Sequence, residues 1–457
     1  MKNDNDYTAE NDMHNRVISL IDGSIDAAAQ GPRQRAQLRR DYKDNEQWTS
    51  AERAILEGRK ESCITDNLIK DKVDTYIGIE QKLRTDPKAY PRNPDDEEAA
   101  TAATKGLRYV ADKNRLNEEF TLSFESMLVE GTEAIEVTVS GGSEDENGDI
   151  DCMAVPWDRL ILDQHARRLD YSDARFVGQM IWMDLQEAKE RFPDSANMLQ
   201  EMQSEDWQGE YQDEPERWYQ PDRNRVLIFE LYYKHAKQVM FCRGWRGGFI
   251  NEPSPSQYVD ENGKTLWPYV VQSSWVTRHG ERVGAVERFM DPQRNVNKRL
   301  SKLLHYLNKN QALYEKDTFD DPAIARRELD KPDGMVEFAP GQVDRFFQLN
   351  NNMELSQGQY QTLVLGLSRF DGIGPNSALM GDQQASGRSL QIQQEAGATK
   401  LGPEFGAHDR FKKRVYQAIW HRIKQYWHAP QWVRVTDDQG APEHIQLNAP
   451  DISQDEN

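Results

Sequence analysis

Hydrophobic and polar positions follow a helical period most clearly over residues 291–311. Apolar side chains recur there every three or four positions, at Val296, Leu300, Leu303, Leu304 and Leu307. Lys and Arg side chains occupy much of the remaining circumference. Asp291 suits a helix N-cap and Pro292 suits the first helical position, where a missing N–H has no consequence. The pattern predicts an amphipathic helix whose apolar stripe needs a partner.

A second helical stripe follows at about 352–370 and offers that partner. Its apolar positions are Tyr360, Leu363, Val364 and Leu367. The segment between the two stripes, 312–349, is short, charged and rich in turn-forming residues. We therefore expect a helical hairpin with a small excursion at its tip.

The N-terminal half predicts helices followed by strands. Helical periodicity marks 65–85, 95–114 and 116–130. Gly131 is placed as the C-cap of the last of these helices. The period then changes to two, and strands are predicted at 134–139, 150–155, 226–234, 238–242 and 269–276. The first two of these strands indicate a β-hairpin.

The C-terminal half begins with a stretch at 372–387 that is rich in Gly, Ser, Asn and Gln and nearly uncharged, which predicts a loop. A helix resumes at about Arg388, breaks near Gly402 and continues to Trp427. One face of this helix is apolar, with Phe411, Val415, Ile419, Ile423 and Tyr426 in phase. Residues 432–447 predict a final hairpin.

Composition adds a strongly acidic balance. The 457 residues include 29% charged residues, and the formal net charge is −20. This disfavours a simple nucleic-acid binder, because affinity for phosphate comes from clustered Lys and Arg. Two segments are exceptions: 287–316 holds seven Lys and Arg against three acids, and 408–428 holds six against one. The simplest interpretation is that these are solvated helix faces.

Motifs for catalysis or cofactor binding are absent from the sequence. It contains no P-loop, zinc cluster, HExxH, nucleophile elbow or kinase signature. The acidic stretch 145–151 is only superficially similar to a calcium loop, since its glycine is misplaced and no glutamate closes the pattern. We expect no enzyme activity, no cofactor and no metal site.

The three cysteines, Cys63, Cys152 and Cys242, are odd in number and far apart, which predicts reduced thiols. No window approaches the roughly 18 to 20 apolar residues of a membrane span. The N-terminus lacks the apolar core of a signal peptide. We expect a protein made and used inside a cell, without membrane contact.

Four segments, in this order, give the chain a family resemblance. They are VDTYIGIEQKLRTDPKAYPRNPDDEEAA (73–100), VPWDRLILDQHARRLDYSDARFVGQMIWM (155–183), MDPQRNVNKRLSKLLHYLNK (290–309) and GIGPNSALMGDQQASGRSLQIQQ (372–394). With them the chain resembles the portal proteins of tailed double-stranded-DNA bacteriophages, in particular the short-tailed branch. The segments are spread over most of the chain, so together they are more specific than any single motif.

The resemblance implies an α+β portal fold with a helical stem hairpin, a mixed α/β wing, a small clip and a helical crown region. The implied parts are a wing at 1–285, a first stem helix at 286–311, a clip at 312–349, a second stem helix at 350–371, a tunnel loop at 372–387, a long helix towards the crown at 388–430, and a C-terminal hairpin and tail at 431–457. Related chains commonly extend further, so a long C-terminal helical barrel is expected to be absent or cut away.

The resemblance also implies three sets of functional residues. The DNA-channel stem would present Arg294, Lys298, Arg299 and Lys302. The tunnel loop would present Asn376, Ser377, Met380, Gln383, Gln384, Ser386 and Arg388. The clip would face the terminase with Asp317, Asp320, Asp321, Arg326, Arg327 and Glu328.

The implied function is that of a portal subunit, the head-to-tail connector of the virion. Copies of the chain would form a ring, a dodecamer in the family, at one capsid vertex, where double-stranded DNA is packaged and ejected. Other implied partners are the terminase large subunit, scaffolding and major capsid proteins, and tail adaptor or head-completion proteins. Assembly would occur in the cytoplasm of the bacterial host. The alternative is a cytoplasmic nucleic-acid-binding or processing protein that uses the basic helices.

Overall fold

The structure, a computed structural model, describes most of the chain. The described residues are 4–26, 32–59, 61–91, 93, 96–141, 147–201, 218–220, 223–308, 312–316, 318–329, 335–338, 340–341, 346–348, 352–374, 402–428, 431–436 and 442–447. The chain divides into two compact units. We call them the sheet unit, residues 1–40, 73–286 and 401–457, and the hairpin unit, residues 41–72 and 287–400.

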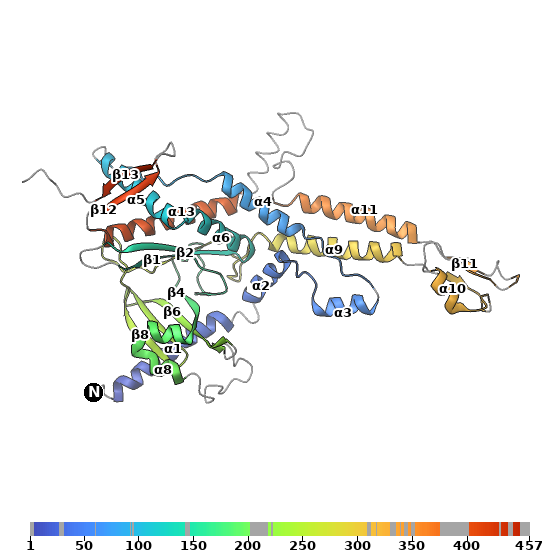
Figure 1. Cartoon of the computed structure of the whole chain (residues 1–457), viewed down its shortest axis with the longest axis horizontal. Coiled ribbons are helices and arrows are strands. Elements are labelled where there is room, and N and C mark those ends of the chain that lie inside the picture. Colours follow the sequence, from blue (N-terminus) through green and yellow to red (C-terminus); the bar gives the residue numbers. More distant parts are fainter. Residues whose placement is uncertain are drawn as a thin grey trace, which may run out of the picture. The chain divides into compact units, whose positions relative to one another are not determined.

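Antiparallel strands form the framework of the sheet unit (Figure 1). The strands are β1 (Thr132–Ser140), β2 (Asp149–Ala154), β3 (Leu160–Leu162), β4 (Phe176–Asp184), β5 (Tyr219–Gln220), β6 (Arg225–His235), β7 (Gln238–Trp245), β8 (Gly248–Pro255) and β9 (Tyr269–Ser273). One sheet has the order β2-β1-β9, and the other has the order β3-β4-β6-β7-β8 with β5 paired to β6. The predicted β1–β2 hairpin is confirmed, with Val137 opposite Cys152. Strands β3, β4, β5 and β8 were not predicted.

The sheet unit also contains helices. They are α1 (Asp4–Asp26), α2 (Pro32–Lys43), α4 (Leu68–Lys82), α5 (Glu97–Lys113), α6 (Leu116–Val129), α7 (Leu185–Arg191), α8 (Ala196–Glu201) and α13 (Gly402–Tyr426), with a short 3₁₀ turn at Pro193–Ser195. Helices α2 and α4 each cross the border between the two units. The predicted C-terminal hairpin is confirmed as β12 (Gln431–Thr436) paired with β13 (Pro442–Leu447).

The apolar face predicted for α13 is the centre of the sheet unit's core. Phe411, Val415 and Ile419 are fully buried and lie in one cluster with Phe120 of α6 and Val137 of β1. Their spacing of four residues places them on one side of the helix. Helix α13 therefore packs against the β2-β1-β9 sheet.

Gly131 ends α6 as predicted. Its φ is +97°, a left-handed conformation that L side chains rarely adopt. A Cβ atom at this position would lie 2.7 Å from the backbone of Val283. Only glycine allows both the turn and this close approach.

The hairpin unit is built on two long helices (Figure 1). Its elements are α3 (Ser50–Gly58), α9 (Glu287–Asn308), β10 (Ala312–Tyr314), α10 (Pro322–Leu329), β11 (Phe346–Gln348) and α11 (Asn352–Asp371). Strands β10 and β11, which were not predicted, pair between the two helices. The mixture of helices and antiparallel sheets agrees with the predicted α+β class, and the division into wing, stem, clip and crown stays a prediction.

Candidate functional site

Helix α9 begins one turn earlier than the sequence indicated. It starts at Glu287, so Asp291 is not its N-cap and Pro292 lies inside the helix. The added turn carries Phe289 and Met290, which are 0% and 9% exposed. Burial of these two apolar side chains compensates for the backbone hydrogen bond that an internal proline removes.

Few apolar side chains join α9 to α11. Val296 of α9 and Leu363 of α11 are both buried. The ring centroids of Phe289 and Phe370 lie 5.6 Å apart. Arg299 donates from Nη1 to Oε1 of a glutamine on α11, Gln359, at 2.9 Å. These contacts set the pairing of the two helices.

A second face of α9 is buried but polar. Gln293, Asn297 and Ser301 are 0%, 2% and 1% exposed. They are spaced four residues apart, so they lie one above another along the helix. All three side chains accept hydrogen bonds from backbone N–H groups in the segment that leads into α4.

The hydrogen bonds of this polar face follow a regular step. Ile64 N donates to Ser301 Oγ at 3.1 Å, Asp66 N to Asn297 Oδ1 at 3.2 Å and Leu68 N to Gln293 Oε1 at 3.1 Å. Four helical residues rise about 6 Å, and two extended residues rise about 6.6 Å. The side chains of α9 therefore match every second amide of a segment that runs antiparallel to the helix.

Gln47 continues this polar network. Its Oε1 accepts from Asn297 Nδ2 at 2.6 Å, and its Nε2 donates to the backbone oxygen of Tyr42 at 2.8 Å and to Asn67 Oδ1 at 2.9 Å. Gln47 is 5% exposed. Sequence reasoning missed this site, although the Gln-x₃-Asn-x₃-Ser spacing of α9 was a usable signal.

The four predicted stem cations do not share one direction. Arg294 donates from Nε to the hydroxyl of Tyr42 at 2.9 Å. Lys298 lies on the side of α3, with Nζ 3.1 Å from Glu52 Oε1. Arg299 faces α11, and Lys302 is exposed. Their contact with a channel or a neighbouring subunit stays a prediction.

The apolar stripe of α11 is mostly exposed, contrary to its expected burial against α9. Only Leu363 of the predicted stripe is buried. The exposed fractions of the other stripe residues are 57% for Tyr360, 46% for Val364 and 36% for Leu367, and Leu365 beside them is 53% exposed. At about 100° per residue, Tyr360, Val364 and Leu367 lie on the flank beside Leu363.

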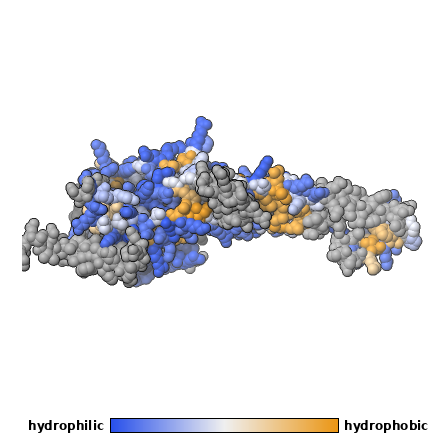
Figure 2. Space-filling view, turned by 90° about the horizontal axis from the view of Figure 1, so that it is seen from above, coloured by the Kyte–Doolittle hydropathy of each residue, from blue (hydrophilic) through white to orange (hydrophobic). Residues whose placement is uncertain are grey.

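Apolar surface consequently lies open on the hairpin. Seen from above, an orange patch crosses the region of α11 (Figure 2). The surrounding sequence adds to this character, because residues 355–368 include no charged side chain. A helix that is neither buried nor charged over four turns is typical of a surface that contacts another molecule.

The predicted clip residues lie on or beside α10. Asp321 is its N-cap, since Oδ1 accepts from the backbone N–H of Ala323 at 2.8 Å. Asp320, Arg326 and Arg327 are exposed, and Glu328 is half-buried. Asp317 lies outside the described residues. The excursion has a small core of its own, in which the rings of Phe319 and Phe338 lie 5.2 Å apart.

All predicted tunnel-loop residues lie outside the described part of the chain. These are Asn376, Ser377, Met380, Gln383, Gln384, Ser386 and Arg388. Their place at a constriction stays a prediction.

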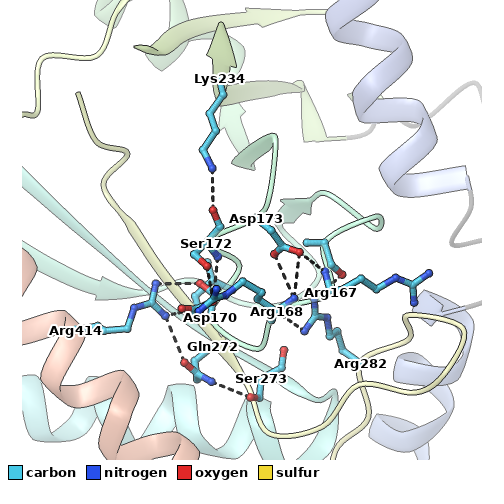
Figure 3. A network of polar contacts seen from close by, with 12 residues as sticks. Arg167, Arg168, Asp170, Ser172, Asp173, Lys234, Gln272, Ser273, Arg282 and Arg414 are labelled. Atoms are coloured by element: carbon cyan, nitrogen blue, oxygen red, sulfur yellow. Dashed lines mark hydrogen bonds and ion pairs between the residues drawn. The ribbon is translucent and has the colours of Figure 1, made fainter. Parts of the chain in front are cut away.

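The basic segment of α13, in the sheet unit, is not simply a solvated face. Arg414 donates from Nη1 to the backbone oxygen of Val271 at 2.7 Å and from Nη2 to that of Asp170 at 3.0 Å (Figure 3). Arg422 is 1% exposed and lies 3.8 Å from the ring centroid of Tyr258. Burial lowers the pKa of Arg422 to about 10. Both guanidinium groups therefore bind other parts of the sheet unit.

A third basic contact of α13 involves two buried acids. His408 Nδ1 lies 2.7 Å from Glu133 Oε2, and Nε2 lies 3.7 Å from Glu80 Oε1. Burial alone would lower the pKa of His408, but the two carboxylates raise it above its usual value. Lys412 donates to Glu80 Oε1 at 3.0 Å. The cluster joins α4, β1 and α13 within one unit, and sequence reasoning did not find it.

The described residues offer no sign of a metal site or a membrane span. Among them, no group of three or more His, Cys, Asp and Glu side chains is placed to hold a metal ion. No helix in this part of the chain is long and apolar enough to cross a membrane. Cys63, Cys152 and Cys242 are free thiols, as predicted.

The hairpin, with its tip excursion and open apolar face, is consistent with a class of subunits that contact one another through paired helices. A family comparison identifies the class: the model of the phage P22-like portal protein family matches residues 22–244 and 237–457. These matches cover most of the chain, so the chain belongs to the phage P22-like portal protein family. It is therefore a structural protein of the phage capsid. A search of the curated proteins found no match.

Proposed function

We propose that copies of this chain form a closed ring at one capsid vertex, through which double-stranded DNA is packaged and later ejected. The α9–α11 hairpin would be the stem, the segment 312–349 the clip, and residues 372–387 the tunnel loop. The ring would be a dodecamer that meets the terminase, the capsid and scaffolding proteins, and later the tail adaptors. This role is structural and requires no catalysis.

The observation that carries this proposal is the open apolar flank of α11. Tyr360, Val364 and Leu367 lie on it, each more than one third exposed. Covering the exposed part of each side chain would contribute about 1 kcal/mol. The same flank on every copy could be covered by a different surface of the next copy. Such a head-to-tail contact generates a ring when its rotation closes.

The charge distribution supports a conduit. A channel must bind DNA, a polyanion, only weakly, because each tight contact with a phosphate group is a barrier to sliding. The chain has a net charge of −20, and Arg414 and Arg422 of the basic helix α13 make their contacts within the fold. A channel wall that is acidic overall and carries only a few rings of Lys and Arg side chains would meet this requirement.

The same distribution argues against the alternative, a nucleic-acid-binding protein that uses its basic helices. High affinity for phosphate needs clustered and accessible Lys and Arg side chains. On α13 only Arg410, Lys413 and Lys424 are exposed, and Lys424 is 2.9 Å from Glu261. The alternative predicts a small stable species with salt-sensitive, sub-micromolar affinity for DNA.

Assembly of purified protein tests the proposal. Native mass spectrometry and negative-stain micrographs should show a large ring, or a monomer that converts to one as concentration rises. Val364→Asp should shift assembly to at least tenfold higher concentration, because it places a charge on the flank that is to be buried. Thr362→Asp, on the opposite flank of α11, is the matched control and should assemble normally.

Two results would overturn the proposal. One is a small species that never forms rings at any concentration or salt. The other is normal assembly of Val364→Asp, which would show that the flank of α11 is not between subunits.

The roles of the stem cations and the tunnel loop have their own test. Charge reversal at Arg294, Lys298, Arg299 and Lys302 should impair packaging or retention of DNA while rings still form. Deletion within 376–386 should do the same if this loop lines the constriction. Unchanged DNA packaging in both variants would show that these residues do not line the channel.

A further inference from the structure

Helix α3 is short and buries none of its residues. It spans nine residues, Ser50–Gly58, and in the part of the chain that the structure describes all of them are exposed or half-exposed. Ile55 is 54% exposed. Around Ile55 the helix presents the small residues Ala51, Ala54 and Gly58, whereas Arg53 and Glu57 lie about 160° and 200° away from it.

Specific hydrogen bonds nevertheless fix both ends of α3. Thr49 and Glu52 form a reciprocal capping box, with Glu52 N donating to Thr49 Oγ1 at 3.2 Å. The preceding Gln47 and the following segment 61–67 are both held in the polar network of α9. An isolated helix of nine residues is marginal in water, and most helical stability comes from packing of an apolar face. Among the apolar side chains of α3, Leu56 is half-buried, whereas Ile55 lacks such packing among the described residues of its own chain.

Helices α3 and α11 lie on opposite sides of α9 within the hairpin unit (Figure 1). Val296, on the α11 side of α9, is buried, and Lys298, two residues on, is 3.1 Å from Glu52 of α3. Two residues correspond to about 200° around a helix. One hairpin unit therefore presents two different apolar surfaces, one on α3 and one on α11, with α9 between the two helices.

We propose that α3 of one copy packs on the α11 flank of the next copy. The contact joins Ile55 and its small neighbours to the stripe of Tyr360, Val364 and Leu367. This inference rests on the proposed function, in which copies of the chain form a ring, and it names the two surfaces that meet.

The sizes and charges of the two surfaces support a second copy of the chain as the molecule that covers each of them. Nine helical residues extend about 13 Å, and the stripe from Tyr360 to Leu367 extends about 10 Å. No unpaired charge would be trapped. Glu52, about 60° from Ile55, is already paired with Lys298 at 3.1 Å, Arg53 and Glu57 point away from Ile55, and residues 355–368 are uncharged. The two surfaces differ, so the contact is head-to-tail and repeats around a ring, instead of ending at a dimer.

Paired cysteines test this arrangement. The exposed thiol background is removed with Cys63→Ser, since Cys152 and Cys242 are buried. In that chain Ile55→Cys and Val364→Cys are combined, assembled rings are treated with a short bis-thiol crosslinker, and the products are separated under denaturing conditions. A ladder of covalent oligomers up to the full ring is expected. Ile55→Cys with Thr362→Cys is the matched control and should give no ladder.

Mixtures of single-cysteine chains distinguish a contact between neighbouring copies from a contact within one chain or a two-fold contact. Each single-cysteine chain alone should stay monomeric after crosslinking, and a mixture of the two should give covalent dimers only. A crosslink within one chain, seen as a faster-migrating monomer, would overturn the inference because α3 would then be covered by its own chain. Dimers of the Ile55→Cys chain alone would overturn it too, since they indicate a two-fold contact.

A substitution gives a second readout. Ile55→Asp should raise the concentration for half-maximal assembly at least tenfold and leave the melting temperature of the monomer unchanged, because the side chain is half-exposed. Glu57→Gln, on the far side of α3, should assemble normally. Rings that form without an Ile55–Val364 crosslink would overturn this inference alone. Absence of rings in every variant and in the parent chain would overturn the proposed function with it.

Discussion

Helix α13 and the α9–α11 hairpin use the same residue types in opposite ways. On α13 the apolar face is buried, and its cations Arg414 and Arg422 also turn inward to backbone oxygens and an aromatic ring. On the hairpin a face with amide and hydroxyl side chains is buried, and apolar residues of α11 such as Val364 lie open. The apolar face of α13 is thus covered within its own unit, whereas the apolar flank of α11 stays open.

The difference has a thermodynamic meaning. Burial of a large apolar side chain contributes roughly 1.5–3 kcal/mol, but an intramolecular hydrogen bond contributes only about 0.5–1.5 kcal/mol net. The polar face of α9 therefore specifies where the segment 61–67 lies more than it stabilises the unit. We expect the hairpin unit to depend on neighbouring copies for much of its stability, and the sheet unit to be stable alone.

The largest expected effect is in the core of the sheet unit. Phe411→Ala removes a fully buried ring and should lower the free energy of unfolding by about 3–5 kcal/mol. Val364→Ala on α11 should change the stability of the monomer by less than about 0.5 kcal/mol, because the side chain is half-exposed there. Denaturant unfolding of the monomer measures both. Comparable losses would show that α11 is covered within its own chain.

A second prediction concerns pH and the buried acids of the sheet unit. Burial and the nearby Glu230 raise the pKa of Glu136 to about 7, from a usual value of 4.5. An acid that holds its proton more tightly in the folded chain stabilises the fold at low pH. This contribution is lost as pH rises from about 4.5 to about 7. At 1.36 kcal/mol per pH unit, the loss is about 3 kcal/mol.

Glu136→Gln should remove that pH dependence. The carboxylate of Glu136 accepts from Gln179 Nε2 at 2.9 Å, and an amide oxygen can accept the same bond. The variant's unfolding free energy relative to the parent should therefore rise by about 3 kcal/mol between pH 4.5 and pH 7. Glu118→Gln, an exposed position on α6, is the control. A constant difference across this range would contradict the assignment.

Sequence periodicity predicted the parts of the fold that each segment determines by itself. The stripe of α13, the glycine at the end of α6 and the β12–β13 hairpin depend on neighbours a few residues away. Apolar side chains recurring at helical spacing also identified α9 and α11 as amphipathic. In each case the local pattern is enough to define the element.

Sequence reasoning failed where a segment far away in the sequence decides which face of a helix is buried. Gln293 and Asn297 are buried because residues 61–68 supply backbone groups to them from more than 200 positions away. The cations of α13 appeared solvated because their acceptors lie on β9 and in the turn at Asp170. The stripe of α11 was correctly recognised as apolar, but its expected burial against α9 is wrong, since only Leu363 of the stripe is buried.

A third prediction tests the polar face of α9. Asn297→Ala leaves the N–H of Asp66 and the Oε1 of Gln47 without their partner, and a buried unsatisfied group costs about 1–3 kcal/mol. Asn295→Ala makes the same change at an exposed position of the same helix and should cost less than about 0.5 kcal/mol. Hydrogen exchange at Asp66 should rise only in the first variant. Equal behaviour of the two variants would mean that this face contributes nothing to the hairpin unit.

The smallest effect is expected for the ion pair between Lys298 and Glu52, which distinguishes the cations of the hairpin from those of α13. Its side chains are 46% and 29% exposed, so a double-mutant cycle of Lys298→Ala and Glu52→Gln should give a coupling of about 0.2–0.5 kcal/mol at pH 7. Burial opposes ionisation of Glu52, but the hydrogen bond from Lys298 lowers its pKa below the usual value. The coupling should therefore be present above about pH 4.5 and disappear as pH falls, opposite in sign to the effect of Glu136. A coupling above about 2 kcal/mol would mean that the hairpin, like α13, is stabilised by its own cations, and the contrast between the two regions would no longer hold.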